Sequence, residues 1–376
     1  MHLKYEGKRS EQAILKIKHN SQLKFIRGIK NASSKLILGE NGRILRLLLS
    51  KEKFRNKIDL VYIDPPFATD NIFTISDEKA STISRINNAP IAYKDNLKGS
   101  EYLEFIRERL ILLRELLSPK GSIYFHIDYK IGHYIKILMD EIFGEENFRN
   151  DITRIKCNPK NFPRKSYGNI KDMILFYTKS DDFIWNDPRV PLTEKDIERL
   201  YKKTDSQGRK YTTIPLHAPG ETINGVTGMK WKGQYPPKGR HWRCPPKKLD
   251  ELDNKGLIEW SKNNVPRKKI FADEHKGKRI QDILYFKDPQ NPIYPTEKNL
   301  DLIKLFISAS SNKNSIVLDC FCGSGTTLKA AQELGRYWIG IDKSKKAIDI
   351  SFNRMYNSQK KLFQNDNFEY LEEQLL

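Results

Sequence analysis

The stretch Ser315-Ile316-Val317-Leu318-Asp319-Cys320-Phe321-Cys322-Gly323-Ser324-Gly325-Thr326-Thr327 decides the fold of this chain. A short β-branched apolar run ends at an acidic residue, a glycine-containing loop follows, and the apolar spacing of residues 327–334 predicts a helix. Glycine lets the backbone approach a ligand closely, and a helix N-terminus offers unpaired N–H groups. The stretch therefore predicts a strand, a ligand-binding loop and a helix in succession.

The type of ligand is narrowed by what surrounds this loop. It lacks the G-x-G-x-x-G of a dinucleotide fold and the Gly-Lys-Ser/Thr of a phosphate-binding loop, which disfavours nicotinamide cofactors and ATP. Asp319 can accept hydrogen bonds from a cationic amino group. A second predicted strand, residues 337–341, leads to Asp342, which is placed to accept from ribose hydroxyls. A nucleotide-like cofactor is expected; a tight turn without a ligand is the alternative.

A second predicted strand end carries a different kind of loop. Residues 58–63 form an apolar run that leads into Asp64-Pro65-Pro66-Phe67. The prolines stiffen the backbone and remove two N–H donors, which leaves nearby carbonyls free to accept. A carboxylate and a carbonyl can together hold both hydrogens of an NH₂ group and direct its lone pair toward an incoming methyl group. Phe67 offers a flat face on which a base removed from the duplex can stack.

The rest of the chain supports an α/β fold. Strands and helices alternate, so we expect a doubly wound, mostly parallel sheet with both loops at the carboxyl ends of its strands, where ligands bind. His126 and Asp128, which end one strand, are expected to line the cleft there, with a catalytic role as the alternative. Further strands are predicted at residues 35–38, 122–127 and 173–177, and helices at 102–117 and 300–309.

The alternation lapses between residues 181 and 288, where Pro and Gly accumulate. We expect the first part of a catalytic domain at 1–180, an inserted module at 181–288 and the second part at 289–376. Residues 202–280 contain 19 Lys and Arg against 8 Asp and Glu, and aromatic side chains stand between the basic ones. The residues expected to contact DNA are Arg240, Arg243, Lys247 and Lys268.

The whole chain of 376 residues has a net charge of +20, which indicates a polyanionic partner, with a generally lysine-rich proteome as the alternative. The basic run from residue 4 to 35 could serve to hold DNA, to cover a sheet edge, or both. No apolar run reaches the roughly 18 residues of a membrane helix, and no secretory segment is recognisable, so a cytoplasmic protein is expected. The four cysteines lack metal-ligand spacing, and no metal is expected.

Taken together, these motifs resemble those of a known family. Asp64-Pro65-Pro66-Phe67 and the loop from Asp319 to Thr327 resemble the catalytic and cofactor motifs of amino-group DNA methyltransferases of bacterial restriction-modification systems. Their order, catalytic loop first, resembles the β class. The segment Ile293-Tyr294-Pro295-Thr296-Glu297-Lys298 resembles the motif that precedes the glycine loop there. Leu36-Ile37-Leu38-Gly39-Glu40-Asn41 resembles the segment that approaches the cofactor's adenine; the family usually has Asp at Glu40 and often Tyr at Phe67.

The resemblance implies a circularly permuted class I fold that uses S-adenosyl-L-methionine to methylate a flipped base in double-stranded DNA. Adenine N6 is preferred because Asp64 resembles the adenine-type motif; cytosine N4 is the alternative, followed by RNA methylation and an inactive DNA-binding protein. Any restriction endonuclease partner would be a separate chain, and a homodimer is left open. The implied catalytic residues are Asp64, Pro65, Pro66 and Phe67, and the implied cofactor-binding residues are Asp319, Phe321, Gly323, Gly325, Thr326, Asp342, Thr296, Lys298, Glu40 and Asn41.

Overall fold

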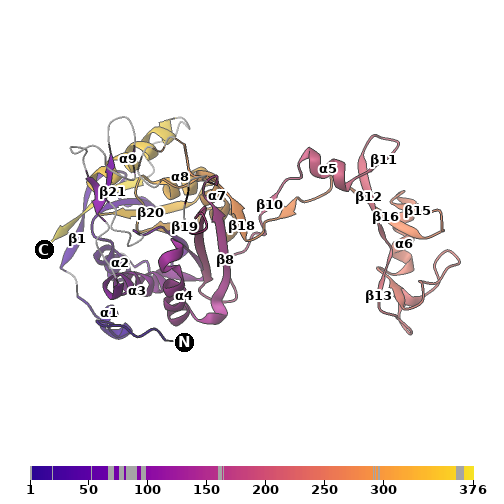
Figure 1. Ribbon diagram of the computed structural model, residues 1–376, viewed down its shortest axis with the longest axis horizontal. Helices are drawn as coiled ribbons and strands as arrows, with labels where there is room; N and C mark the ends of the chain where they lie inside the picture. The colour runs from indigo at the N-terminus through magenta and orange to yellow at the C-terminus, as the bar shows by residue number, and fades with distance from the viewer. Residues whose placement is uncertain are drawn as a thin grey trace. The chain divides into compact units, whose positions relative to one another are not determined.

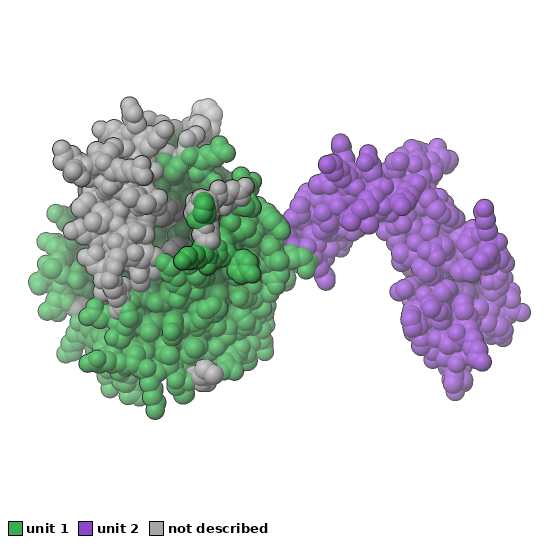
Figure 2. Space-filling model, in the orientation of Figure 1, with its two compact units in different colours: residues 1–188, 281–376 green, residues 189–280 purple. Residues whose placement is uncertain are grey.

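The computed structural model describes residues 2–18, 20–51, 53–66, 72–75, 80–81, 91–94, 99–159, 163, 165–290, 292, 294, 297–360 and 368–376 (Figure 1). Of residues 72–75, 80–81, 91–94 and 358–360 it describes the backbone alone. Contacts divide the chain into two compact units, which Figure 2 shows in different colours. Unit 1 comprises Met1–Pro188 and Gln281–Leu376, and unit 2 comprises Arg189–Ile280. The segment 181–288, expected as an insert, contains unit 2.

Unit 1 is built on one large sheet. Among the described residues, all its strands run in the same direction except β1 and β9. The strand order is β1 (Ser21–Gly28), β21 (Phe368–Leu375), β2 (Ser34–Leu38), β20 (Tyr337–Asp342), β19 (Ile316–Asp319), β3 (Ile58–Ile63), β7 (Leu117–Ile127), β9 (Lys171–Thr178), β8 (Phe148–Ile155) and β18 (Ile283–Tyr285).

Helices cover both faces of this sheet (Figure 1). One face carries α2 (Asn41–Ser50), α3 (Gly99–Leu116) and α4 (Tyr129–Phe143), and the other carries α7 (Leu300–Ser310), α8 (Thr326–Glu333) and α9 (Lys345–Lys360). The doubly wound, mostly parallel α/β architecture expected from the sequence is therefore confirmed. Unit 1 also contains α1 (Glu11–Leu15), the turn η1 (Glu145–Asn147) and a small sheet of β4 (Ile72–Ile75), β5 (Ala80–Ser81) and β6 (Ile91–Lys94).

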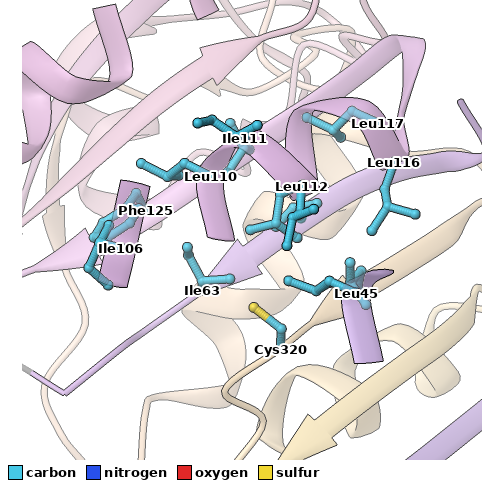
Figure 3. Close-up of a cluster of buried hydrophobic side chains, with 14 of the residues drawn as sticks. Leu45, Ile63, Ile106, Leu110, Ile111, Leu112, Leu116, Leu117, Phe125 and Cys320 are labelled. Carbon is cyan, nitrogen blue, oxygen red and sulfur yellow. The ribbon is translucent and has the colours of Figure 1, made fainter. Parts of the chain in front are cut away.

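Strand β3 is apolar at every position except Asp59 because it is covered on both faces. Val61 and Ile63 belong to the core beneath α2, α3 and α4, where Figure 3 shows Ile63 near side chains of α3. Tyr62 points to the other face, where its ring lies 6.2 Å from that of Phe306 in α7. Alternation along an extended strand puts the side chains of residues two apart on the same face. Asp64 therefore follows Tyr62 on the α7 face.

The basic N-terminal run contributes to the edge of the sheet. Strand β1 pairs with β21 as the last strand on that side, and α1 packs against α3. Some positive charges of this N-terminal run are neutralised inside unit 1: Lys8 lies 2.6 Å from Glu141, and Arg9 lies 2.6 Å from Glu108. Covering a sheet edge is thus a structural role that this run does perform.

Unit 2 has a small core of its own. Trp231 and Trp242 are buried, and Trp231 stacks on Trp260 with ring centres 5.6 Å apart. These tryptophans alternate with basic residues in the sequence, yet burial makes them unavailable for stacking on a nucleic-acid base. The elements are β10 (Arg189–Val190), α5 (Glu194–Leu200), β11 (Lys203–Thr204), β12 (Lys210–Pro215), β13 (His217–Pro219), η2 (Val226–Gly228), β14 (Arg240–Trp242), α6 (Pro246–Asn254), β15 (Ile258–Trp260), β16 (Pro266–Phe271) and β17 (Lys278–Arg279).

In the part of the chain that the structure describes, we find no helix with both the length and the apolar character needed to cross a membrane.

Candidate functional site

The site forms where neighbouring parallel strands end. Strand β19 pairs with β3 on one side and with β20 on the other, and all three run in the same direction. Their carboxyl ends therefore meet at one edge of the sheet, followed or terminated by Asp64, Asp319 and Asp342. The fold thus brings together two loops that lie far apart in the sequence.

Asp64 is held in a defined orientation. Its Oδ2 lies 2.6 Å from Nζ of Lys298, and the two side chains are only 17% and 10% exposed. Lys298 precedes Asn299, whose side chain caps α7 by accepting from the N–H groups of Asp301 and Leu302. The other carboxylate oxygen, Oδ1, is buried and has no hydrogen-bond partner among the described residues. An unpaired buried acceptor is costly, so Oδ1 is the atom that a donor on a ligand would satisfy.

The proline loop is anchored from α3. The hydroxyl of Tyr102 donates to the carbonyl oxygen of Pro66 at 2.6 Å, and the tyrosine side chain is buried. One of the carbonyls that the sequence suggested would be free is therefore already engaged, which fixes the end of the loop. Phe67, expected to stack on the base, lies outside the described residues.

A buried polar chain lies beside Asp64. Tyr62 Oη lies 2.8 Å from His126 Nδ1, and His126 Nε2 lies 3.1 Å from Asp172 Oδ2. Burial, together with the positive charge of Lys298, lowers the pKa of His126. The expectation that His126 lines a cleft was wrong, because its side chain is fully buried in the sheet. Asp128 caps α4 by accepting from the N–H of Lys130 at 2.9 Å.

At the other end of this series of hydrogen-bonded side chains, Asp172 lies between two cationic residues. Asp172 lies 2.6 Å from Lys156 and 3.4 Å from Arg154. Burial alone would raise the pKa of Asp172, but the hydrogen bond with His126 and the charges of Lys298 and Lys156 hold that pKa well below its usual value. Asp172 is therefore ionised, and it orients the imidazole ring.

Asp319 shapes the glycine loop from within. Its Oδ1 accepts from the N–H of Phe321 at 3.0 Å, and its Oδ2 accepts from the hydroxyl of Thr327 at 2.6 Å. Burial raises the pKa of Asp319 to about 7, and the negative charges of Asp64 and Asp342 contribute to the rise. A cationic group placed beside this carboxyl would favour its ionised form.

Asp342 ties the same loop to β20. Its two carboxylate oxygens accept from the N–H groups of Gly323 at 3.0 Å and Ser344 at 2.8 Å. Burial raises the pKa of Asp342 as well. Each carboxylate oxygen can accept more than one hydrogen bond, so the carboxylate keeps capacity for a ligand hydroxyl.

The two loop glycines have positive φ angles, +50° at Gly323 and +79° at Gly325. A Cβ at Gly325 would lie 2.8 Å from Oγ of Ser351, which itself donates to the Gly323 carbonyl at 2.7 Å. Thr326 begins α8 and accepts from Arg354 at 3.0 Å. Phe321 is partly buried, with its ring 6.1 Å from that of Phe105.

Glu40 and Asn41 lie next to this loop and brace it. Glu40 caps α2, accepting from the N–H groups of Gly42 and Arg43, and pairs with Arg109. Burial opposes ionisation, but the charge of Arg109 lowers the pKa of Glu40. Asn41 donates to the carbonyl of Cys320 at 2.9 Å and accepts from Arg109 at 2.9 Å. Thr296, also expected at the cofactor, lies outside the described residues.

The four residues expected to contact DNA lie in unit 2. Arg240, Arg243 and Lys247 are exposed, and Lys268 in β16 is half-buried. Arg243 donates to the carbonyl of Pro215 at 3.0 Å, and Arg240 lies 3.3 Å from the ring nitrogen of His217. The described residues contain no cluster of three or more His, Cys, Asp or Glu suited to a metal ion.

Sequence reasoning missed three residues that brace the two loops and the buried polar chain beside them. Tyr102, Asp172 and Arg109 carry no motif, and each meets its partner only through the folding of distant segments. It did select Lys298, but as a cofactor contact, whereas the structure places its ammonium on Asp64.

Comparison with known proteins gives the family. The N6_N4_Mtase family model, described as DNA methylase, matches residues 58–353. The chain therefore belongs to this family of DNA methylases, and the expectation of an amino-group DNA methyltransferase is confirmed.

Two relatives found by sequence agree with this assignment. The Type II methyltransferase M.EcaI of Enterobacter cloacae is 42% identical over 353 residues, covering 91% of this chain and 75% of the relative. The StyLTI Mod subunit of a type III restriction-modification enzyme from Salmonella typhimurium is 27% identical, over 81% of this chain but only 50% of its own length. The crystal structure of an M1.HpyAVI–SAM complex is 18% identical, covers 85% of this chain and 99% of its own, and has a TM-score of 0.46.

Proposed function

We propose that this chain transfers a methyl group from S-adenosyl-L-methionine to N6 of a specific adenine in double-stranded DNA, with the base flipped out of the duplex. The observation that carries the proposal is Asp64, whose Oδ2 is held by Lys298 while its buried Oδ1 has no partner among the described residues. An exocyclic amino group has two hydrogens to donate, and Oδ1 is the acceptor for one of them.

The proline loop provides the acceptor for the second hydrogen. Tyr102 already donates to the carbonyl of Pro66, so we assign this role to the carbonyl of Pro65. An amino nitrogen held by both acceptors directs its lone pair away from the ring plane, toward the methyl donor. Phe67, the next residue, is proposed to stack on the base. Catalysis by this arrangement is mainly positioning, since the groups meet in a near-attack geometry without a strong base.

The residues around the glycine loop fit S-adenosyl-L-methionine. Burial raises the pKa of Asp319 to about 7, and the amino group of the cofactor would supply a positive charge that favours the ionised carboxylate. Asp342 is placed for the ribose hydroxyls, and the positive-φ glycines keep the loop open for close approach. When bound, the sulfonium supplies an electrophilic methyl group. Asn41 and Glu40 are proposed to position the adjoining wall through Arg109 and Cys320.

Recognition of the target sequence is proposed for unit 2. Its basic excess and its exposed residues Arg240, Arg243 and Lys247 suit contacts with phosphates and base edges. M.EcaI is named a Type II methyltransferase, and by analogy this chain would act in a restriction-modification system alongside a separate endonuclease. A cytoplasmic location is a further prediction about its setting, and the formation of a homodimer is left open.

Nucleoside mass spectrometry of DNA from a methylation-free host that expresses this chain tests the proposal, and single-molecule sequencing of the same DNA reports the site. N6-methyladenine at one short motif is expected. N4-methylcytosine without N6-methyladenine would refute the choice of base and keep the mechanism. Absence of both, with DNA binding retained, would favour the alternative of an inactive DNA-binding protein.

A further inference from the structure

We propose that unit 1 has a duplex-binding surface of its own, at the edge of the sheet formed by the carboxyl ends of β7, β8 and β18 and the amino end of β9, which grips phosphates with lysines and tyrosines. This inference rests on the proposed action on double-stranded DNA, and it adds a contact surface outside unit 2. We call it the carboxyl-edge surface. Its members are Lys130, Lys165, Lys171 and Lys287, with Tyr129, Tyr167 and Tyr285.

Sheet register makes this surface continuous. Ile155, the last residue of β8, pairs with Lys171 of β9 on one side and with Tyr285 of β18 on the other. Ile127, the last residue of β7, pairs with Met173, two residues from Lys171. Figure 1 shows β8 and β18 side by side. Paired residues on neighbouring strands lie about 5 Å apart, so these positions form one row along the edge.

The same edge continues into the catalytic site. Strand β3 is parallel to β7, with Ile63 opposite Phe125. Asp64 therefore follows β3 at the same end of the sheet at which Tyr129 and Lys130 begin α4. A duplex whose target base is held at Asp64 extends well beyond that base, since each base pair adds about 3.4 Å of axis. The carboxyl-edge surface lies where unit 1 can support that flanking DNA.

The side chains suit a phosphate backbone. All four lysines are exposed, and within the described ranges none of them is in an ion pair. Tyr129 is 42% exposed, Tyr167 101% and Tyr285 77%. Tyrosine hydroxyls donate hydrogen bonds to phosphate oxygens, and lysines neutralise them.

Acidic residues at this edge do not oppose the lysines, because each has a partner inside unit 1. Asp128 is buried as the cap of α4. Asp172 is buried against Lys156 and His126. Asp288 lies 2.5 Å from Arg154. The solvent-facing balance of the edge is therefore positive.

The experiment compares two variants of the full chain that lose the same number of positive charges. In the edge variant Lys130, Lys165, Lys171 and Lys287 are changed to Gln. In the control variant the changes are Lys53→Gln, Lys57→Gln, Lys120→Gln and Lys313→Gln, all exposed lysines at the opposite, amino edge of the same sheet. Lys120 forms an exposed pair with Asp182 at 3.1 Å, which contributes little to stability.

Affinity for a duplex that contains the target site is measured by fluorescence anisotropy from about 50 to 200 mM salt. Each phosphate contact contributes about 0.9 to the slope of log affinity against log salt, or about 3.5-fold over this fourfold range. Four lost contacts lower the slope by about 3.6. Raising the salt fourfold should therefore weaken binding by the edge variant about 150-fold less than binding by the parent. At the lowest salt it should bind more weakly than the control variant, whose slope should match the parent's.

Cofactor binding and thermal unfolding confirm that both variants are folded. Should the fourfold edge variant fail to fold, the pair Lys171→Gln with Lys287→Gln should lower the slope by about 1.8. Equal slopes for the edge and control variants would overturn this inference while leaving the proposed function intact. A parent chain that does not bind the duplex would overturn both.

Discussion

The ammonium of Lys298 lies 2.6 Å from Oδ2 of Asp64, which joins the segment before α7 to the loop after β3. This contact leaves Oδ1 as the buried oxygen without a partner in the described structure. The lysine thereby determines which oxygen of the carboxylate is presented to the target amino group. Three roles can therefore be tested independently: Asp64 as the acceptor, Lys298 as the cation that positions it, and the glycine loop as the cofactor site.

Asp64→Ala should abolish methyl transfer while leaving cofactor affinity near that of the parent, because the acceptor for the amino group is lost and the glycine loop is untouched. A drop in turnover of at least about 100-fold is expected, the size associated with misplacing a reacting group. Transfer of a tritiated methyl group to DNA and calorimetry with the cofactor measure the two effects. Turnover within a few-fold of the parent would show that Asp64 is not the acceptor.

Lys298→Met should lower turnover by about 10- to 100-fold without weakening cofactor binding, because Asp64 loses the group that orients it. Lys298→Arg keeps the positive charge and should restore a large part of the activity. Single-turnover rates and cofactor affinity are compared for both variants. A large loss of cofactor affinity with an unchanged single-turnover rate would return Lys298 to the cofactor-binding role that the sequence suggested.

Gly325→Ala should destabilise the chain and weaken cofactor binding. The new Cβ would approach Ser351 Oγ to 2.8 Å, and the φ of +79° is unfavourable for alanine. Gly335→Ala is the matched control, because its φ of +72° imposes similar backbone strain while its nearest neighbour, Lys313, lies at 3.5 Å. Each change should cost about 1 kcal/mol through φ, and only Gly325→Ala should also lower cofactor affinity. Equal effects on affinity would mean that the close packing at Ser351 does not shape the loop.

Cofactor affinity should depend on pH through Asp319. Its pKa of about 7 in the ligand-free protein means that the carboxyl is largely protonated below that pH. A cationic amino group binds the anion, so affinity should rise as pH increases toward 7 and level off above it. Calorimetry from pH 5.5 to 8 measures this, and Asp319→Asn should bind more weakly with a flatter profile. A parent profile as flat as that of the variant would contradict the assignment.

The same raised pKa has a defined effect on stability. The unfolded carboxyl has its ordinary pKa of 3.8, and the folded one about 7. The folded state therefore holds its proton more tightly, and stability without ligand should decrease as pH rises from about 4 to 7 and then level off. The full difference would be about 4 kcal/mol. Urea unfolding at pH 5 and 8 should show about 2.6 kcal/mol of this difference. Asp319→Asn should remove most of the dependence, and an unchanged dependence would place its origin elsewhere.

Local pattern was enough to predict the main elements. The predicted bounds agree within a residue or two with those of β3, β19, β20, α7 and α8. A short, mostly apolar run reflects a strand that is buried on both faces, and 3.6-residue spacing reflects a helix that is buried on one. Boundaries differed where a strand follows a helix directly: β7 begins at Leu117, the residue at which the preceding helix was expected to end. In the sequence the tryptophans of unit 2 stand among basic residues, which suggested a surface that faces a polyanion. In the structure they form the core of unit 2 instead.

The sequence by itself determined the class of chemistry. Asp64-Pro65-Pro66 and the loop from Asp319 to Gly325 specify their local backbone, since proline and glycine restrict or extend φ within the loop itself. Tertiary structure alone decided how those loops are held. Lys298 meets Asp64, Tyr102 meets Pro66 and His126 is buried against Asp172. Such partners are joined through space by the packing of the sheet, and no local preference of either segment encodes the distance between them.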